Sequence, residues 1–400
     1  MPSRNDAYLR HAKQYLEVAK RAKKLYVRGG DNVLKGLALF NIEFPDIQRG
    51  QEWSVKNWEI SEDTARLCAK YPDVAVFWLS LRLHPHDMIV WMSSAVFAAS
   101  KLGDKKSESN CLGNIGNAYS RLGEMRKAID YYEKGLAITR VIGDKRGEGT
   151  HLDNIGSQFN ALGDPRKAIE YHEQALAIAH EIGDKNAEDS CLCNLGIAYS
   201  TLGDKHKAID YYEQALGISR DLGDKHSEEI NLDNLGCACA ELGEMLKAID
   251  YFERALGISR DIGYKRGEGT TLGHLGNTYA ESGDMHKAIG YHEQALAIAR
   301  DFNDKRNEGN HLSNLGSDYY ALGDMYKAKG YYEQALAIAC DIGNKHGEGD
   351  RLFYLSLVHE KSGDKQKALD YAQSAIAIYE TIESPYVNNA RKRVKRLAKL

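Results

Sequence analysis

Glycine recurs along this chain at intervals of 40 residues, and this period constrains the fold more than any other feature of the sequence. Asn303 fills the one vacant place in the first set, which comprises Gly103, Gly143, Gly183, Gly223, Gly263 and Gly343. A second set lies midway, at Gly123, Gly163, Gly203, Gly243, Gly283, Gly323 and Gly363. Repeats of this length build stacks of similar units, so the usual division of 400 residues into compact domains does not apply. The period predicts seven copies of a helix-turn-helix unit.

The residues around these glycines indicate where helices end and begin. Glycine tolerates the left-handed conformation in which helices often end, and the Asp or Glu that follows it is expected to cap the next helix. Apolar residues between the glycines recur at i, i+3 and i+7, as in Leu152, Ile155 and Phe159. This is the period of a helix and not of a strand. We therefore predict an all-α fold.

A third set of glycines lies inside the first helix of each unit, where glycine costs about 1 kcal/mol relative to alanine. These residues are Gly116, Gly156, Gly196, Gly236, Gly276 and Gly316. Their recurrence predicts a close approach of the second helix. The expected partners are the small residues Ala128, Ala168, Ala208, Ala248, Ala288 and Ala328.

The order of residues within a unit resembles a known family. One unit contains Leu112, Ile115, Gly116, Tyr119, Ala128, Tyr132 and Gly135, and another repeats the order as Leu192, Leu195, Gly196, Tyr199, Ala208, Tyr212 and Ala215. This order resembles the tetratricopeptide repeat, although the period of 40 exceeds the usual ~34 residues. Segments such as 168–176 look like the long repeats of partner-of-inscuteable proteins. The resemblance implies a right-handed α-solenoid that binds extended peptides along a concave groove.

Both ends of the chain depart from the period, and we predict that they cap the array. Residues 1–102 are expected to form five helices, at 6–27, 31–44, 45–57, 61–83 and 85–102, with a core built around Trp53, Trp58, Trp78 and Trp91. Residues 103–383 are expected to hold the repeats, at about 104–143, 144–183, 184–223, 224–263, 264–303, 304–343 and 344–383. Residues 384–400 are predicted to form a basic capping helix with the apolar stripe Val387, Ala390, Val394 and Leu397.

Part of the N-terminal region has a second resemblance. Segments 36–40, 47–53 and 82–85 look like the stretch that joins the ATPase module to the repeats in bacterial NB-ARC signalling proteins. The chain contains no Gly-x-x-x-x-Gly-Lys-[Ser/Thr] sequence, so the resemblance does not include the phosphate-binding loop.

Composition excludes several classes of protein. A content of 43% hydrophobic and 28% charged residues is typical of a folded chain and not of a disordered one. The sequence has no run of 18 apolar residues and no apolar leader, so we expect neither a membrane span nor a signal peptide, and a cytoplasmic location. Seven scattered cysteines form no disulfide framework. Basic residues concentrate in 1–28 and 385–400, but no nucleic-acid recognition motif accompanies them, which favours solvated faces of capping helices over nucleic-acid contact.

Residues rotated off the packed stripe of each first helix are expected to line the groove. Asparagine recurs there, and its amide both donates and accepts hydrogen bonds, which suits the backbone of an extended peptide. The predicted peptide-binding residues are Asn110, Asn114, Asn117, Arg121, Asp153, Asn154, Asn194, Asp233, Asn234, Glu241, His274, Asn277, Asn314 and Tyr354. The alternative is that the asparagines bond to a neighbouring repeat and hold the stack in register. The acidic members favour a peptide with some basic residues.

No catalytic motif accompanies the repeats. The two Cys-x-Cys pairs, at 191–193 and 237–239, point apart on a helix and cannot share a metal ion, and no hydrolase or zinc-protease motif occurs. We therefore expect no enzyme activity, no cofactor and no metal. Two functions stay open: a non-catalytic scaffold or adaptor that binds an extended segment of a partner protein, and a regulatory sensor subunit of a signalling or defence system that acts through the N-terminal helices. The oligomeric state is unknown.

Overall fold

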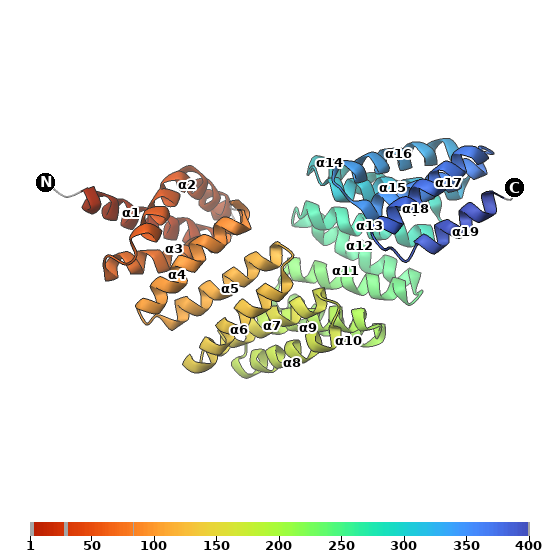
Figure 1. Ribbon diagram of the computed structural model, residues 1–400. Coiled ribbons are helices and arrows are strands. Elements are labelled where there is room, and N and C mark those ends of the chain that lie inside the picture. Colours follow the sequence, from red (N-terminus) through yellow and green to blue (C-terminus); the bar gives the residue numbers. More distant parts are fainter. Residues whose placement is uncertain (1–3, 28–30, 83, 399–400) are drawn as a thin grey trace. The chain divides into compact units, whose positions relative to one another are not determined.

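The computed structural model describes residues 4–27, 31–82 and 84–398, without the side chains of 27, 31, 33, 73 and 75–82. Within these ranges every regular element is a helix, and successive helices form pairs, as the sequence predicts for an all-α solenoid (Figure 1). None of the described helices is long and apolar enough to cross a membrane. The chain divides into two compact units, Met1–Ala215 and Leu216–Leu400.

The described residues of the N-terminal region form four helices where the sequence predicted five. They are α1 (Arg4–Val27), α2 (Asp31–Asn57), α3 (Glu62–Arg82) and α4 (Pro85–Lys101). The expected break at Pro45 is wrong, because α2 continues through it. Pro45 lies on the exposed face of α2, and Phe40 and Ile47 on either side of it are fully buried, so the core holds both halves of the helix. Residues 28–30 and 83, at expected helix boundaries, lie outside the described residues.

The N-terminal helices pack in the same pattern as the repeats. Helix α1 pairs with α2 and α3 with α4, and α3 also contacts the first repeat helix, α5 (Lys105–Arg121). One core cluster runs through these helices and includes Phe40, Tyr71, Trp91 and Ile115. Trp53 packs against this cluster and Trp58 against a smaller one, while the side chain of Trp78 lies outside the described part. The N-terminal region therefore extends the stack by two further helix pairs.

Seven helix pairs follow. The first helices are α5, α7 (Lys145–Ala161), α9 (Lys185–Leu202), α11 (Lys225–Glu241), α13 (Lys265–Glu281), α15 (Lys305–Leu322) and α17 (Lys345–Lys361). The second helices are α6 (Met125–Ile142), α8 (Pro165–Ile182), α10 (Lys205–Leu222), α12 (Met245–Asp261), α14 (Met285–Asp301), α16 (Met325–Asp341) and α18 (Lys365–Thr381). The boundary between the two compact units falls inside α10.

The periodic glycines mark helix ends as predicted. All 13 have a φ between +66° and +95°, and Asn303, in the vacant place, has a φ of +51°. Asparagine is the residue that most often replaces glycine in this left-handed conformation. The predicted caps form where the next residue is aspartate, as at Asp144, but Glu124 and Glu244 make no side-chain cap. The longer glutamate side chain pairs instead with a lysine three residues on.

The glycines inside the first helices make room for rings. A Cβ atom added to Gly236 would lie 2.6 Å from Cε1 of Phe252, and one at Gly276 would lie 2.4 Å from the ring of His292. In all six units, the atoms nearest to such an added Cβ belong to a ring on the second helix. The close approach that the sequence predicted is therefore present, but a ring and not the expected alanine fills it.

Replacing Gly236 with alanine should destabilise the fold by about 1–2 kcal/mol, since the clash with Phe252 outweighs the gain in helix propensity. Gly257→Ala is the matched control, because Gly257 is a helical glycine with open space around its Cα, and alanine there should stabilise by about 0.5–1 kcal/mol. Urea denaturation of both variants measures the difference. Equal effects at the two positions would contradict the packing role of Gly236.

Helix α19 (Val387–Leu397) closes the C-terminal end. Ala390 and Leu397 are buried in two small core clusters with residues of α18, and the partly buried Val387 and Val394 pack against these clusters. The apolar stripe predicted this contact. Arg393 is buried as well, which the sequence did not indicate.

Candidate functional site

The predicted groove residues lie on the first helices of the repeats, and none is fully buried. The exposed ones are Asn110, Asn117, Arg121, Glu241, Asn277 and Tyr354. The half-buried ones are Asn114, Asp153, Asn154, Asn194, Asp233, Asn234, His274 and Asn314. The 40-residue period therefore gives each compact unit a series of polar residues in matching positions, whose side-chain contacts differ from repeat to repeat.

In the Met1–Ala215 unit, the polar residues bond to one another. The side-chain nitrogen of Asn194 lies 3.1 Å from both carboxylate oxygens of Asp153, which belongs to the preceding repeat. His172 Nδ1 lies 2.6 Å from the same carboxylate. The Tyr132 hydroxyl donates to Asn117 Oδ1 at 2.6 Å. Asn194 and Asp153 therefore connect two repeats, which is the arrangement that the structural alternative requires.

The Leu216–Leu400 unit contains a similar network with different residues. Asn314 donates to Asn277 of the preceding repeat at 2.9 Å. The same amide oxygen lies 3.1 Å from His292 Nε2, and the other ring nitrogen of His292 lies 2.7 Å from Asp318. Asp233 accepts from Thr271 and contacts His274, so its carboxylate is also occupied. The asparagines and acids expected to face a ligand thus serve partly to join neighbouring repeats.

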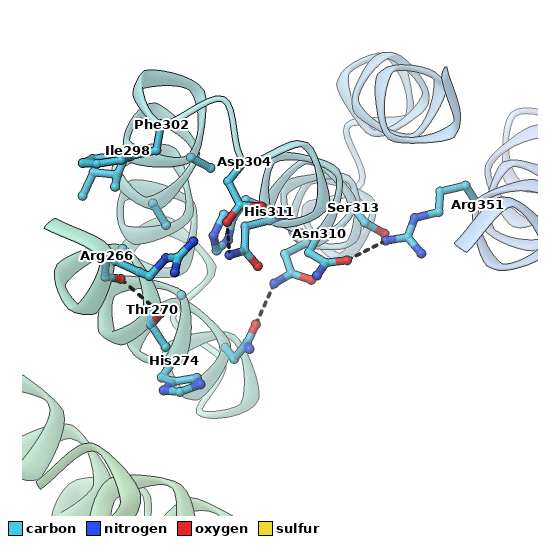
Figure 2. Close-up of a pocket in the computed structure, with 17 residues that line it drawn as sticks. Arg266, Thr270, His274, Ile298, Phe302, Asp304, Asn310, His311, Ser313 and Arg351 are labelled. Carbon is cyan, nitrogen blue, oxygen red and sulfur yellow. Dashed lines mark hydrogen bonds between the residues drawn. The ribbon is translucent and has the colours of Figure 1, made fainter. Parts of the chain in front are cut away.

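A cavity of about 350 Å³ opens between first helices of the Leu216–Leu400 unit (Figure 2). Polar groups on α13 and α15 line it, together with an apolar wall from Ile298 on α14 and Phe302 just beyond that helix. His274, Asn277 and Asn314 are the predicted residues that reach this cavity. Such a mixture of apolar wall and amide groups is typical of ligand-binding surfaces.

The Met1–Ala215 unit has a cavity of about 370 Å³ in the equivalent place. Thr150, Ile178 and Asp184 in this cavity correspond to Thr270, Ile298 and Asp304 in the other, each 120 residues later. Asp153 and Asn154 are the predicted residues that reach it. The repeat therefore builds the same hollow twice, and the two differ in the side chains that the individual repeats supply.

Arg351 distinguishes the Leu216–Leu400 cavity. Only 9% of this residue is exposed, its Nε has no hydrogen-bond partner, and the nearest carboxylate oxygen, on Asp350, lies 3.8 Å away. In Figure 2 its guanidinium extends to Asn310, which accepts a 3.2 Å hydrogen bond. Burial lowers the pKa of Arg351, although the guanidinium keeps its charge at neutral pH. The cavity thus holds a cation whose charge is incompletely compensated.

Several lining residues escaped sequence analysis. Thr150, Thr270 and Asn310 occupy the position of Asn110 in other repeats. Applying the prediction for Asn110 to every repeat would therefore have found them. Ile178 and Ile298 come from second helices, and Arg351 lies one position further along its helix. No local signal in the sequence indicates that these side chains turn toward the cavity.

Comparison with known proteins places the chain in a family. A family model described as the tetratricopeptide repeat matches residues 148–221, 227–301 and 307–381, and a second model with the same description matches residues 109–138. These matches cover more than half of the sequence. The chain belongs to the tetratricopeptide repeat family. A search of curated protein sequences finds no match to this tetratricopeptide repeat protein.

Solved structures share its fold at low sequence identity. A signal transduction ATPase with numerous domains that carries a tetratricopeptide repeat sensor, from Pyrococcus horikoshii, aligns with a TM-score of 0.65 and 18% identity over 97% of this chain and 59% of its own. The quorum sensor NprR from B. thuringiensis aligns with a TM-score of 0.58 and 14% identity, covering 92% and 97%. A Rap protein complexed with competence and sporulation factor aligns with a TM-score of 0.56 and 13% identity, covering 98% of each chain.

Proposed function

We propose that this tetratricopeptide repeat protein is a non-catalytic interaction scaffold that binds an extended peptide segment of a partner protein along its first helices. The observation that carries the proposal is the pair of equivalent cavities, one in each compact unit, which combine apolar walls with amide and hydroxyl groups. Repeated hollows of this kind suit a ligand with a repeating backbone. The NprR and Rap structures support the proposal, since proteins of this fold include a quorum sensor and a Rap protein in complex with competence and sporulation factor.

The cavity in the Leu216–Leu400 unit is the proposed anchor point. Asn307 and Asn310 present exposed amides there, and two cations, Arg266 and Arg351, outnumber the one lining carboxylate, that of Asp304. The expectation of a basic peptide relied on Asp153, Asp233, Glu241 and Glu281, and the carboxylates of the first two are engaged by other side chains of the protein. The charge of this cavity instead favours a carboxylate on the bound segment, from Asp, Glu or a free C-terminus, because a guanidinium and a carboxylate form strong charge-assisted hydrogen bonds.

Filling the anchor cavity should strongly weaken partner binding. Thr270 is exposed on α13 and lines the cavity, so Thr270→Trp should reduce capture of a native partner from lysate at least tenfold while leaving helicity unchanged. Thr150→Trp makes the same change in the equivalent cavity and should reduce capture less. Crosslinking and mass spectrometry of the captured complex locate the bound segment. Full capture by Thr270→Trp, or a crosslink map confined to other surfaces, would refute this site.

A regulatory sensor that acts through its N-terminal helices is the second candidate. Leu34 and Ile42 are 73% and 74% exposed on α2, and Ala38 between them is exposed too, so one face of this helix presents an apolar stripe. The tetratricopeptide sensor of the Pyrococcus ATPase and the NB-ARC-like segments of this sequence agree with such a role. In the same capture experiment, loss of the partner with Leu34→Ser and Ile42→Ser but not with Thr270→Trp would favour it. The resemblance to partner-of-inscuteable repeats suits either candidate.

A further inference from the structure

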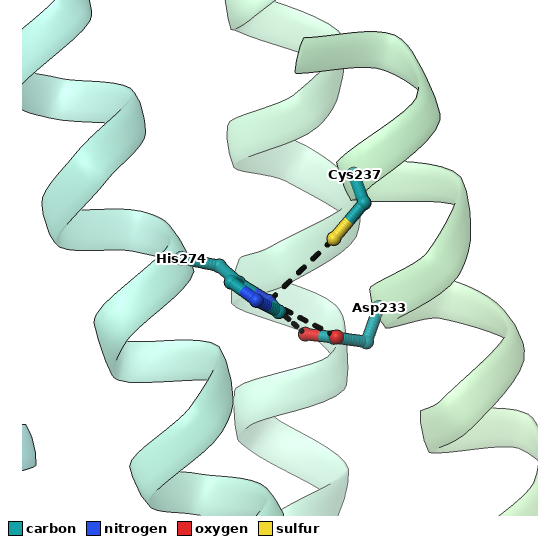
Figure 3. Close-up of side chains that lie close together, drawn as sticks. All are labelled: Asp233, Cys237 and His274. Atoms are coloured by element: carbon teal, nitrogen blue, oxygen red, sulfur yellow. Dashed lines mark hydrogen bonds and ion pairs between the residues drawn. The ribbon is translucent and has the colours of Figure 1, made fainter. Parts of the chain in front are cut away.

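Three side chains of different chemistry converge between α11 and α13 (Figure 3). Asp233 and Cys237 lie four residues apart on α11, so both face α13 from successive turns. His274 on α13 lies between them, with Nδ1 3.0 Å from Asp233 Oδ2 and 3.6 Å from Cys237 Sγ. The carboxylate oxygen, thiol sulfur and imidazole nitrogen all lie within 4.8 Å of one another.

These separations match those between ligands of a tetrahedral metal ion. Zinc binds thiolate sulfur at about 2.3 Å and imidazole nitrogen at about 2.0–2.1 Å, which sets the two atoms about 3.6 Å apart at the tetrahedral angle. The imidazole nitrogen and the carboxylate oxygen would lie about 3.3 Å apart around such an ion. This distance is a few tenths of an ångström longer than the 3.0 Å between His274 Nδ1 and Asp233 Oδ2. Side-chain rotation alone can supply this adjustment.

Neighbouring groups favour coordination as well. The Thr271 hydroxyl donates a 2.9 Å hydrogen bond to Asp233 Oδ1, which orients the carboxylate so that both of its oxygens lie near His274 Nδ1. The side chains of His274 and Asp233 are 33% and 15% exposed, so an ion in solution can reach them.

No other described repeat pair has this set of ligands in register. The positions equivalent to Asp233, Cys237 and His274 hold Asp153, Ser157 and Asn194 in one pair, and Gly273, Asn277 and Asn314 in another. The repeat scaffold therefore does not require the three side chains. A structural network at this position can be built from an amide and a carboxylate alone, as Asn194 and Asp153 demonstrate.

We propose that Asp233, Cys237 and His274 bind a transition-metal ion, with Zn²⁺ the best match to this mixture of ligands. The Cys237 thiol loses its proton on binding, the His274 Nδ1 loses the proton it shares with Asp233, and both protons pass to solvent. Three protein ligands leave one tetrahedral position for water or for a side chain of a bound partner. The ion would connect two successive repeats, 224–263 and 264–303.

Metal titration of the intact, reduced and metal-free chain tests this assignment. Zn²⁺ competition against a chromophoric chelator should show one site per chain, and Co²⁺ should give the sulfur-to-metal charge-transfer band and the intense visible bands of a tetrahedral thiolate site. Cys237→Ser should remove the charge-transfer band, and Cys237→Ser and His274→Gln should each weaken binding by more than the roughly 10- to 100-fold that loss of an outer-shell partner costs. Circular dichroism confirms the fold of each variant.

Two control variants should keep both signals. Cys340→Ser removes the exposed thiol of α16, and Asp153→Asn removes the equivalent carboxylate of the other compact unit. Absence of stoichiometric binding would overturn the proposal. A charge-transfer band that survives Cys237→Ser, or disappears with Cys340→Ser, would overturn it too, because the ion would then sit on another thiol. Since these readouts do not involve a peptide, they are independent of the proposed function.

Discussion

Lowering the pH from 6.5 to about 4 is expected to destabilise the chain by up to about 3 kcal/mol for each of two histidines, His151 and His311. Burial lowers the pKa of both imidazoles from 6.5 to about 4. They are 5% and 9% exposed, and Nδ1 of each has no hydrogen-bond partner. The unfolded chain takes up these protons near pH 6.5, whereas the folded chain resists them until about pH 4. The stabilisation is therefore complete above pH 6.5 and is lost as the pH falls through this window.

Urea denaturation at several pH values across this window measures the effect. The repeats supply a matched control, because Cys111 and Cys191 occupy the equivalent position in other units. The double variant His151→Cys and His311→Cys should lose much less stability between pH 6.5 and 4 than the wild type. Carboxylate titration affects both proteins equally, so the difference between them isolates the histidines. Parallel loss in the two proteins would show that the imidazoles are not the cause.

Removing the guanidinium of Arg393 is expected to cost about 3 kcal/mol and to release α19 from the end of the stack. Arg393 is 6% exposed and donates to Ser356 Oγ at 2.7 Å and to the Ser356 carbonyl at 2.8 Å. Its other partner is Glu360, at 2.7 Å. Breaking a buried ion pair costs about 3–5 kcal/mol. The lower limit applies here because the side chain of Glu360 is 25% exposed to water and stays paired with Arg396.

Arg393→Met preserves most of the side-chain volume and removes the charge, so denaturation of this variant measures the electrostatic contribution. Arg391→Met is the control on the same helix, since Arg391 pairs with Glu380 on the surface and such pairs contribute only about 0–1 kcal/mol. Limited proteolysis should cleave Arg393→Met within α19 and spare the control. Equal stability of the two variants would show that the Arg393 guanidinium does not hold α19 in place. A docked α19 agrees with a capping role for the basic C-terminal segment.

Several features of the fold could be predicted from the sequence because they depend on neighbouring residues. The left-handed conformation at Gly143 and at Asn303 is a property of one residue and its helix end, so the spacing of these residues located the turns. The apolar period located the buried face of each helix. Predictions failed at Pro45, which the core on either side keeps within α2, and at Glu124, whose longer side chain pairs with a lysine three residues on and does not cap its helix.

The candidate site could be predicted only in part. The positions of Asn194 and Asn314 on first helices followed from the period, but their engagement by Asp153 and Asn277 did not. The sequence by itself therefore determined the repeat, the helix boundaries within the repeats and the register of the polar positions, since each depends on residues a few places apart. Only the tertiary structure decided which side chains meet. Asp233 and His274 lie 41 residues apart in the sequence, and the angle at which successive repeats pack brings their side chains together.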